Sequence, residues 1–236
     1  MKNILSFILA IVQYTLDIIY PRICIICLNA LVRGESHICI SCLNNLPRTN
    51  YHILNKHDLE QRFWGIIPVE NVCSFFYFQH DGVRAMIHEI KYRGGELLAV
   101  YTGSLYAKEL AESGYLNQID LIIPVPLHSK RLKERGYNQS LRIAEGLSLV
   151  CEKPVAEDIL IRKIYNPTQT KVSREQRWEN VNSIFKLINK DKIKDKHILL
   201  VDDVLTTGAT LIECAKELQK EPSVKISILT LACVRS

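Results

Sequence analysis

The sequence lacks the features that mark several whole classes of protein. Its most apolar stretch, residues 4–19, falls short of the about 20 residues that a membrane-spanning helix needs, and it contains Asp17. We find no internal repeat and no low-complexity segment. With 47% hydrophobic and 23% charged residues, the composition is neither that of a disordered chain nor that of a fibrous one. The 236 residues therefore indicate a soluble globular protein with one domain of ordinary size and a small appendage.

The N-terminal residues favour an amphipathic helix over residues 1–22, which Pro21 would end. Its narrow polar stripe repeats at spacings of three and four, through Asn3, Ser6, Ala10, Gln13 and Asp17. The alternative is a secretory signal, because Lys2 precedes an apolar run, but no small-x-small cleavage site follows. We expect a helix that packs on its own domain or lies at a membrane surface. The protein would then be cytoplasmic, or membrane-associated through this helix, with no transmembrane span.

Predicted strands and helices alternate along the rest of the chain. The strands are expected at residues 72–78, 120–123, 159–161, 197–201 and 224–233, and the helices at 82–92, 97–113, 137–150 and 209–219. Such alternation predicts an α/β fold with a parallel sheet flanked by helices. We expect four parts: the N-terminal helix (1–22), a cysteine-rich segment (23–46), a linker (47–65) and the α/β domain (66–236).

One segment joins a buried strand, residues 198–201, to a pair of acids and a small polar turn. The acids are Asp202 and Asp203, and the turn and the start of the next helix contain Thr206, Thr207, Gly208, Ala209 and Thr210. Ligands bind at the carboxyl ends of parallel strands, and a helix N-terminus favours a phosphate. The acids could accept hydrogen bonds from sugar hydroxyls or help to hold a hydrated Mg²⁺. A simple capped turn with solvated acids would explain only one threonine and one acid.

Positive charge is concentrated in two segments. Residues 128–142 and 162–177 each contain five Lys or Arg against one Glu, whereas the whole chain carries a net charge of +5. Such segments suit a diphosphate or a nucleic-acid backbone, although a solvated basic helix face is the common alternative. The candidate anion-contacting residues are Lys130, Arg131, Arg135, Arg174 and Arg177.

Four of the eight cysteines form two C-x2-C pairs. Cys24, Cys27, Cys39 and Cys42, with eleven residues between the pairs, supply the four thiolates that a tetrahedral Zn²⁺ requires. Four protein ligands close such a site, so the metal would be structural and would supply folding energy. Two disulfides after secretion are the alternative interpretation. His37 could compete as a ligand, but its polar surroundings favour an ordinary surface histidine.

Taken together, these motifs resemble the ComF family, the competence protein F group linked to natural transformation. The resemblance covers nearly the whole chain: the paired cysteines, Phe76 and Phe78 with residues 90–94, residues 124–127 and 135–139, Thr170, Arg174, Arg177 and Asn180, and the loop 202–210. The last loop matches the phosphoribosyl diphosphate motif of type I phosphoribosyltransferases. The resemblance implies a type I phosphoribosyltransferase-like domain that binds phosphoribosyl diphosphate with Mg²⁺. It also implies a role in carrying single-stranded DNA from the membrane uptake channel to recombination proteins.

Two functional hypotheses follow. In the first, the protein is a single-strand-binding module, with Tyr137, Tyr165 and Trp178 interleaved among the basic residues as stacking platforms. In the second, it is an active, amidophosphoribosyltransferase-like enzyme of nucleotide metabolism with no DNA role. The sequence identifies neither an acceptor substrate nor a catalytic residue, so it leaves turnover open.

Overall fold

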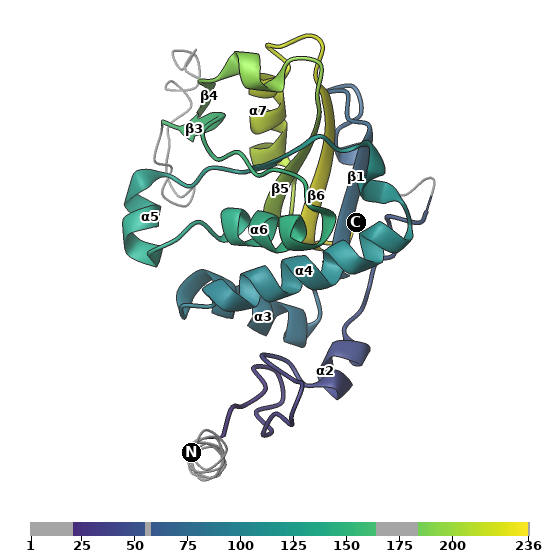
Figure 1. Cartoon of the computed structure of the whole chain (residues 1–236), viewed down its shortest axis with the longest axis vertical. Coiled ribbons are helices and arrows are strands. Elements are labelled where there is room, and N and C mark those ends of the chain that lie inside the picture. The colour runs from purple at the N-terminus through teal and green to yellow at the C-terminus, as the bar shows by residue number, and fades with distance from the viewer. Residues whose placement is uncertain (1–20, 55–57, 164–183, 236) are drawn as a thin grey trace, which may run out of the picture.

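A four-stranded parallel sheet forms the centre of the molecule. The computed structural model describes residues 21–54, 58–163 and 184–235, and Figure 1 shows the chain. The strands are β1 (Asn71–Tyr77), β2 (Leu121–Pro124), β5 (His197–Leu205) and β6 (Lys225–Cys233). Their order is β1-β6-β5-β2, and every neighbouring pair is parallel. The predicted parallel sheet is thus confirmed.

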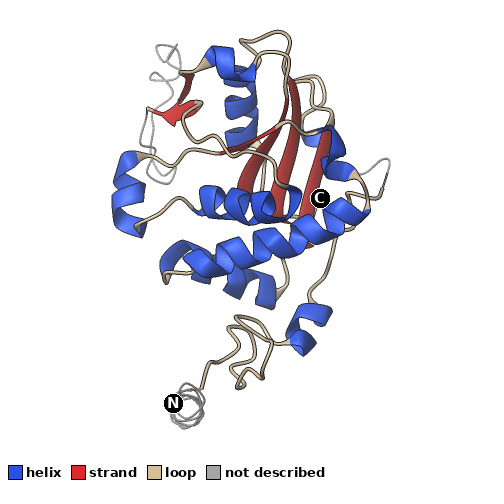
Figure 2. Ribbon diagram, viewed as in Figure 1, coloured by secondary structure: helices blue, strands red, loops and turns tan. Residues whose placement is uncertain are grey.

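Helices cover both faces of this sheet (Figure 2). Three of them pack on one face and one packs on the other, and each face has its own apolar cluster. The first three are α3 (Asp81–Tyr92), α4 (Glu96–Glu112) and α6 (Gln139–Cys151), and the fourth is α7 (Ala209–Leu218). The strands read as nearly continuous apolar runs because both faces of the sheet are buried. All four helices lie where the apolar periodicity predicts them.

Two glycines allow α4 and α6 to pack closely. A Cβ atom on Gly103 would lie 2.4 Å from the carbonyl oxygen of Ile143, and one on Gly146 would lie 2.1 Å from that of Val100. Any side chain at either position would therefore push the helices apart. This close contact fixes the position of the start of α6, which faces the candidate site described below.

Smaller elements lie around the central sheet. A short helix and an antiparallel strand pair lie on the side of β2, and further short helices join the larger elements. They are α2 (Ile40–Asn45), α5 (Ser129–Arg135), β3 (Leu160–Arg162) paired with β4 (Phe185–Leu187), and the 3-10 helices Glu60–Arg62, Tyr115–Gln118 and Lys190–Ile193. The sequence predicts β3 but misses its partner β4, since three residues are too few to show a period.

The cysteine-rich segment and the predicted linker both contribute to the core of the domain. Cys24, Ile38 and Leu46 belong to the apolar cluster beneath α3 and β1. In residues 47–65, Leu59 and Phe63 are fully buried in the cluster on the other face. The linker residues therefore pack on the sheet. The predicted domain boundaries stay a prediction.

Two other expectations concern the N-terminus and the membrane. Residues 1–20 of the predicted amphipathic helix (1–22) lie outside the described residues. Within residues 21–54, 58–163 and 184–235, none of the helices combines the length and the apolar character that crossing a bilayer requires.

Candidate functional site

Strand β5 continues through both acids and ends at Leu205. The prediction that it ends at Val201 is wrong, because β6 is long enough to continue the pairing, with Asp202 opposite Thr230 and Leu205 opposite Cys233. Asp202 and Asp203 therefore lie within the carboxyl-terminal part of a strand instead of in a loop. Their backbone positions are fixed by the ladder, which suits residues that must hold a ligand accurately.

An open turn follows β5 and leads into α7. Gly208 adopts the left-handed conformation (φ 85°) and precedes the first turn of α7 without providing a side-chain cap. Thr206, Thr207, Ala209 and Thr210 are exposed, and the loop surrounds a hollow of about 40 Å³. The Ala209 N–H donates a long hydrogen bond, 3.4 Å, to the Thr207 hydroxyl, and the N-cap residue Gly208 adds no side-chain bond of its own. The remaining N–H groups of a helix N-terminus and its partial positive charge favour an anion. The predicted loop is thus neither a closed helix nor sealed in the core.

Arg62 holds this turn from behind. Its guanidinium donates hydrogen bonds to the carbonyl oxygens of Leu205, Thr206 and Val234. These bonds satisfy carbonyl groups that would otherwise compete for cations and would leave the turn less ordered. Sequence reasoning missed this role because Arg62 lies more than 140 residues from the turn, inside the predicted linker.

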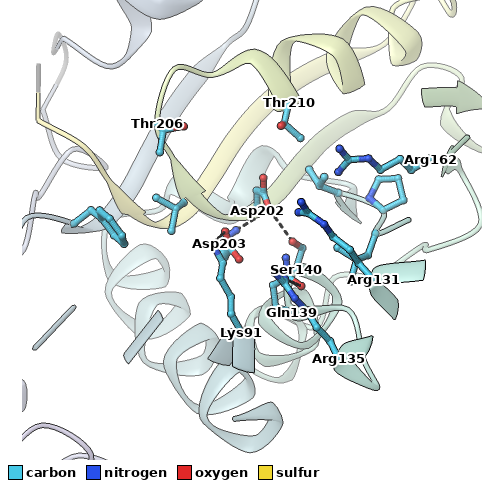
Figure 3. Close-up of a pocket in the computed structure, with 15 residues that line it drawn as sticks. Lys91, Arg131, Arg135, Gln139, Ser140, Arg162, Asp202, Asp203, Thr206 and Thr210 are labelled. Atoms are coloured by element: carbon cyan, nitrogen blue, oxygen red, sulfur yellow. Dashed lines mark hydrogen bonds and ion pairs between the residues drawn. The ribbon is translucent and has the colours of Figure 1, made fainter. Parts of the chain in front are cut away.

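A cavity of about 250 Å³ opens beside the turn and brings together residues from several elements (Figure 3). Among the predicted residues, the cavity is lined by Asp202, Asp203, Thr206, Thr210, Arg131 and Arg135. Thr207, Gly208 and Ala209 line the adjoining hollow of the turn. Lys130 is exposed on α5 and does not line the cavity, while Arg174 and Arg177 lie outside the described residues.

Four further lining residues were not predicted as site residues: Lys91, Gln139, Ser140 and Arg162. The Lys91 ammonium lies 3.1 Å from a carboxylate oxygen of the buried Asp203. The Ser140 hydroxyl donates to Asp202 Oδ1 at 2.8 Å, and Gln139 Oε1 accepts a hydrogen bond from Arg135 at 2.9 Å. Lys91 and Gln139 fall in motifs that the family resemblance uses, so a signal was present. Arg162 begins the basic segment 162–177, so it too carried a signal, whereas nothing in the sequence places Ser140 at the site.

The two carboxyl groups of the cavity, those of Asp202 and Asp203, lie in an unfavourable electrostatic environment. Burial, and then the neighbouring Asp203 carboxylate, raise the pKa of Asp202 to about 7. The second carboxylate oxygen of Asp203, Oδ2, is buried without a hydrogen-bond partner among the described residues. Orphaned buried oxygens are rare in folded proteins, and one in a cavity points to a ligand or cation that completes it.

The exposed aromatic ring near the cavity is that of Tyr92, which is 65% exposed. The guanidinium of Arg135 lies 5.2 Å from the centre of this ring. Tyr137, which the sequence suggests as a stacking platform, is 7% exposed and donates its hydroxyl to the carbonyl oxygen of Ile90. The buried ring of Tyr137 thus acts mainly in packing. Tyr165 and Trp178 lie outside the described residues.

The four predicted cysteine ligands converge at a second place, at the end of the molecule where α2 lies. All four Sγ atoms lie within 4.8 Å of one another, and those of Cys27 and Cys39 are 3.7 Å apart. With metal–sulfur bonds of about 2.3 Å, a tetrahedral site needs sulfurs about 3.8 Å apart. The four cysteines can therefore hold a structural metal ion. His37 is not part of this cluster.

Backbone N–H groups support the sulfurs of this cluster. The N–H of Cys39 donates to Cys24 Sγ and the N–H of Cys42 donates to Cys39 Sγ, both at 3.4 Å. Burial acts to raise the pKa of Cys24, but hydrogen bonds from the backbone of Cys27, Cys39 and Ile26 outweigh it and lower the pKa to about 6. A thiolate, the form that binds metal, is thus favoured at Cys24, whereas burial and hydrogen bonds to the neighbouring thiols raise the pKa of Cys42.

Comparisons with known proteins identify the type of domain. Residues 137–236 match the phosphoribosyl transferase domain family. A purine phosphoribosyltransferase from Pyrococcus horikoshii shares 23% sequence identity and covers 56% of this chain and 73% of its own, with a TM-score of 0.36. The domain match and the parallel sheet with its flanking helices agree with the predicted type I phosphoribosyltransferase fold.

Relatives are found among competence and DNA utilization proteins. Competence protein F of Haemophilus influenzae is 34% identical over 129 residues, which are 54% of this chain and 56% of that protein. The DNA utilization protein YhgH of Escherichia coli O157:H7 is 29% identical over 62% of this chain and 65% of its own length. Competence protein ComFC of Bacillus subtilis is 29% identical over 66% of this chain and 61% of its own. The chain thus matches less than two thirds of the length of each relative.

Proposed function

Because the chain belongs to the ComF family, we propose that it binds phosphoribosyl diphosphate and single-stranded DNA and acts in DNA uptake during natural transformation. One observation carries the proposal. The turn before α7, two acids and three arginines meet in a single cavity at the carboxyl edge of a parallel sheet. We place this function in the cytoplasm, with the membrane uptake channel and recombination proteins as partners.

The arrangement of the cavity suits the three parts of phosphoribosyl diphosphate. The 5-phosphate would accept hydrogen bonds from the N–H and hydroxyl groups of residues 206–210. The ribose hydroxyls would donate to Asp202 and Asp203, and the diphosphate would lie against Arg131 and Arg135.

The acids also fit a magnesium ion that arrives with the diphosphate. Carboxylate oxygens are the ligands that Mg²⁺ prefers, and Asp203 Oδ2 is an oxygen with no partner among the described residues. Such an ion would neutralise the diphosphate. The contribution of Asp202 and Asp203 is to orient the ribose, with Ser140 and Lys91 holding the two carboxylates in place.

Single-stranded DNA would bind along the cationic rim of the same cavity. Arg131 and Arg135 would contact phosphates, and the exposed ring of Tyr92 would stack against a base beside Arg135. Proteins that hold single strands combine a basic groove with aromatic platforms in this way.

We further propose that the metal of the cysteine cluster is zinc. Four thiolates at tetrahedral spacing suit Zn²⁺, and a site with four protein ligands leaves no open position for chemistry. The metal would hold the segment 23–46 against α3 and β1.

The alternative function is that of an active phosphoribosyltransferase without a DNA role. It is favoured by the cations at the cavity, since a departing diphosphate needs positive charge to stabilise it. The acceptor that would attack C1 of the ribose is not identified by the cavity.

One experiment separates these functions. Phosphoribosyl diphosphate with Mg²⁺ and a short single strand are titrated against the full chain, separately and together, and released diphosphate is assayed. Saturable binding of both ligands without diphosphate release supports the proposal. Diphosphate release together with no DNA binding would favour the enzyme, and binding of neither ligand would refute both.

A further inference from the structure

A second and larger cavity adjoins the first. It has a volume of about 490 Å³ and lies between α5, the start of α6 and β3. Both cavities are lined by Pro126, Leu127 and Arg162, so these three residues form a shared wall. A volume of this size lies within the range of about 300–1,000 Å³ that is usual for small-ligand sites.

Arg162 of the shared wall and its neighbour Arg131 carry positive charge that no ion pair among the described residues neutralises. Arg162 has a buried Nε without a hydrogen-bond partner, and its guanidinium lies 5.4 Å from the centre of the Phe185 ring. Arg131 and Arg162 both point into the first cavity (Figure 3), and neither forms an ion pair with a described residue. Burial, and then the nearby Arg131 cation, lower the pKa of Arg162. Two neighbouring guanidiniums that form no ion pair with a described carboxylate are suited to an anion.

The second cavity itself is mainly apolar. Leu132 of α5 and Ile161 of β3, which are 41% and 40% exposed, contribute to its lining from two different elements. Asn138 and Glu157 add a few polar groups to the lining. An occupant with a flat apolar body, hydrogen-bonding edges and an adjoining anionic group would satisfy the cavity, Arg162 of its wall and the neighbouring Arg131.

We propose that the second cavity takes a nucleobase of a bound single strand, whose phosphate lies between Arg131 and Arg162. This inference rests on the proposed binding of single-stranded DNA and adds to it a defined place for one base. It also predicts that the second cavity is used by the strand alone, whereas both ligands contact the arginines of the first cavity. Residues found only in the second cavity should affect the strand and not phosphoribosyl diphosphate.

The test compares a thymidine oligonucleotide with a strand of the same length that carries abasic sugars. The variant is Leu132→Asn with Ile161→Asn, whose side chains are already partly exposed, and the control is Leu149→Asn, on the exposed face of α6. We expect the variant to bind the base-bearing strand about tenfold more weakly by fluorescence anisotropy, because a buried base contributes about that much affinity. Its binding of the abasic strand should change less than about twofold.

Two companion measurements complete the test. Arg162→Gln should weaken both strands, whereas its neighbour Lys163→Gln, which does not line either cavity, should weaken them less. Calorimetry with phosphoribosyl diphosphate should give the same affinity for wild type and for the Leu132/Ile161 variant. The inference would be overturned if that variant lost affinity equally for the base-bearing and the abasic strand, or lost affinity for neither. Failure of the wild type to bind phosphoribosyl diphosphate would refute the proposed function while leaving the base-specific result intact.

Discussion

The cysteine cluster and the carboxyl edge of the sheet both gather polar groups, but they do so in opposite ways. In the cluster, four sulfurs lie within 4.8 Å of one another and receive N–H groups from their own segment. At the sheet edge, acids, arginines and hydroxyls surround a cavity of about 250 Å³, and one carboxylate oxygen stays unpartnered among the described residues. The first region is complete once it holds an ion, so it stabilises the fold. The second is incomplete without a larger ligand.

The largest effect is expected from removal of the metal. Since Cys24, Ile38 and Leu46 belong to the core beneath α3, a strong chelator should lower the free energy of unfolding by several kcal/mol. Thermal unfolding followed by circular dichroism measures this, and added Zn²⁺ should restore the melting temperature. Cys39→Ser should act like the chelator, whereas Cys151→Ser, outside the cluster, should not. An unchanged melting temperature in chelator would remove the stabilising role.

A large effect on binding is expected from the acid pair. Asp202→Ala with Asp203→Ala should weaken phosphoribosyl diphosphate binding by about 100-fold or more, because the ribose hydroxyls lose their acceptors. The chain should stay folded, since Lys91 is 24% exposed and can reach solvent. Calorimetry gives the affinity, with Glu112→Ala and Asp191→Ala, two exposed acids elsewhere, as the control pair. Undiminished binding would exclude these acids from the site.

A smaller effect is expected from the cations of the rim. Arg131→Glu with Arg135→Glu should weaken single-strand binding and flatten its dependence on salt, since fewer counterions are released. Lys108→Glu with Lys225→Glu changes the net charge equally, at an exposed position on α4 and at the amino end of β6. Anisotropy titrations between low and physiological salt compare the slopes. Equal slopes for the two double variants would place the DNA surface elsewhere.

The smallest effect concerns pH. The raised pKa of Asp202 means that the folded state keeps a proton that the unfolded state loses, so stability should fall as pH rises from about 4 to about 7. Asp202→Asn removes the titrating group, so over this pH range the variant should lose about 2 kcal/mol less stability than the wild type. This figure is smaller than the full pKa shift implies because the Asp202 side chain contacts solvent. Urea unfolding of wild type and variant at pH 5, 6, 7 and 8 measures the difference. A difference that does not change with pH would mean that Asp202 titrates normally.

The sequence predicts those parts of the fold and site that depend on neighbouring residues. The strand, the acids and the turn up to Thr210 are contiguous, and the cysteines carry a recognisable spacing, so both regions could be located in advance. The apolar periodicity of α3, α4, α6 and α7 is equally local, which is why these helices were predicted close to their observed bounds.

The rest depends on contacts between distant segments. Ser140 reaches Asp202 across 62 residues, and Arg62 reaches Thr206 across 144. The end of β5 could not be placed either. Whether residues 202–205 continue the strand depends on the length of its partner strand β6 and not on the polar character of Asp202 and Asp203. Sequence patterns report local periodicity, whereas these features follow from the tertiary pairing of elements.

The central claim is that residues 206–210 bind a phosphate monoester at the edge of the sheet. Titration of the isotope-labelled protein with ribose 5-phosphate, followed by amide NMR, tests it most directly. We expect saturable shifts that are largest for the amides of Thr207, Gly208, Ala209 and Thr210, and we expect these shifts to disappear on addition of excess phosphoribosyl diphosphate. Shifts that leave these four amides unmoved while others saturate would contradict it.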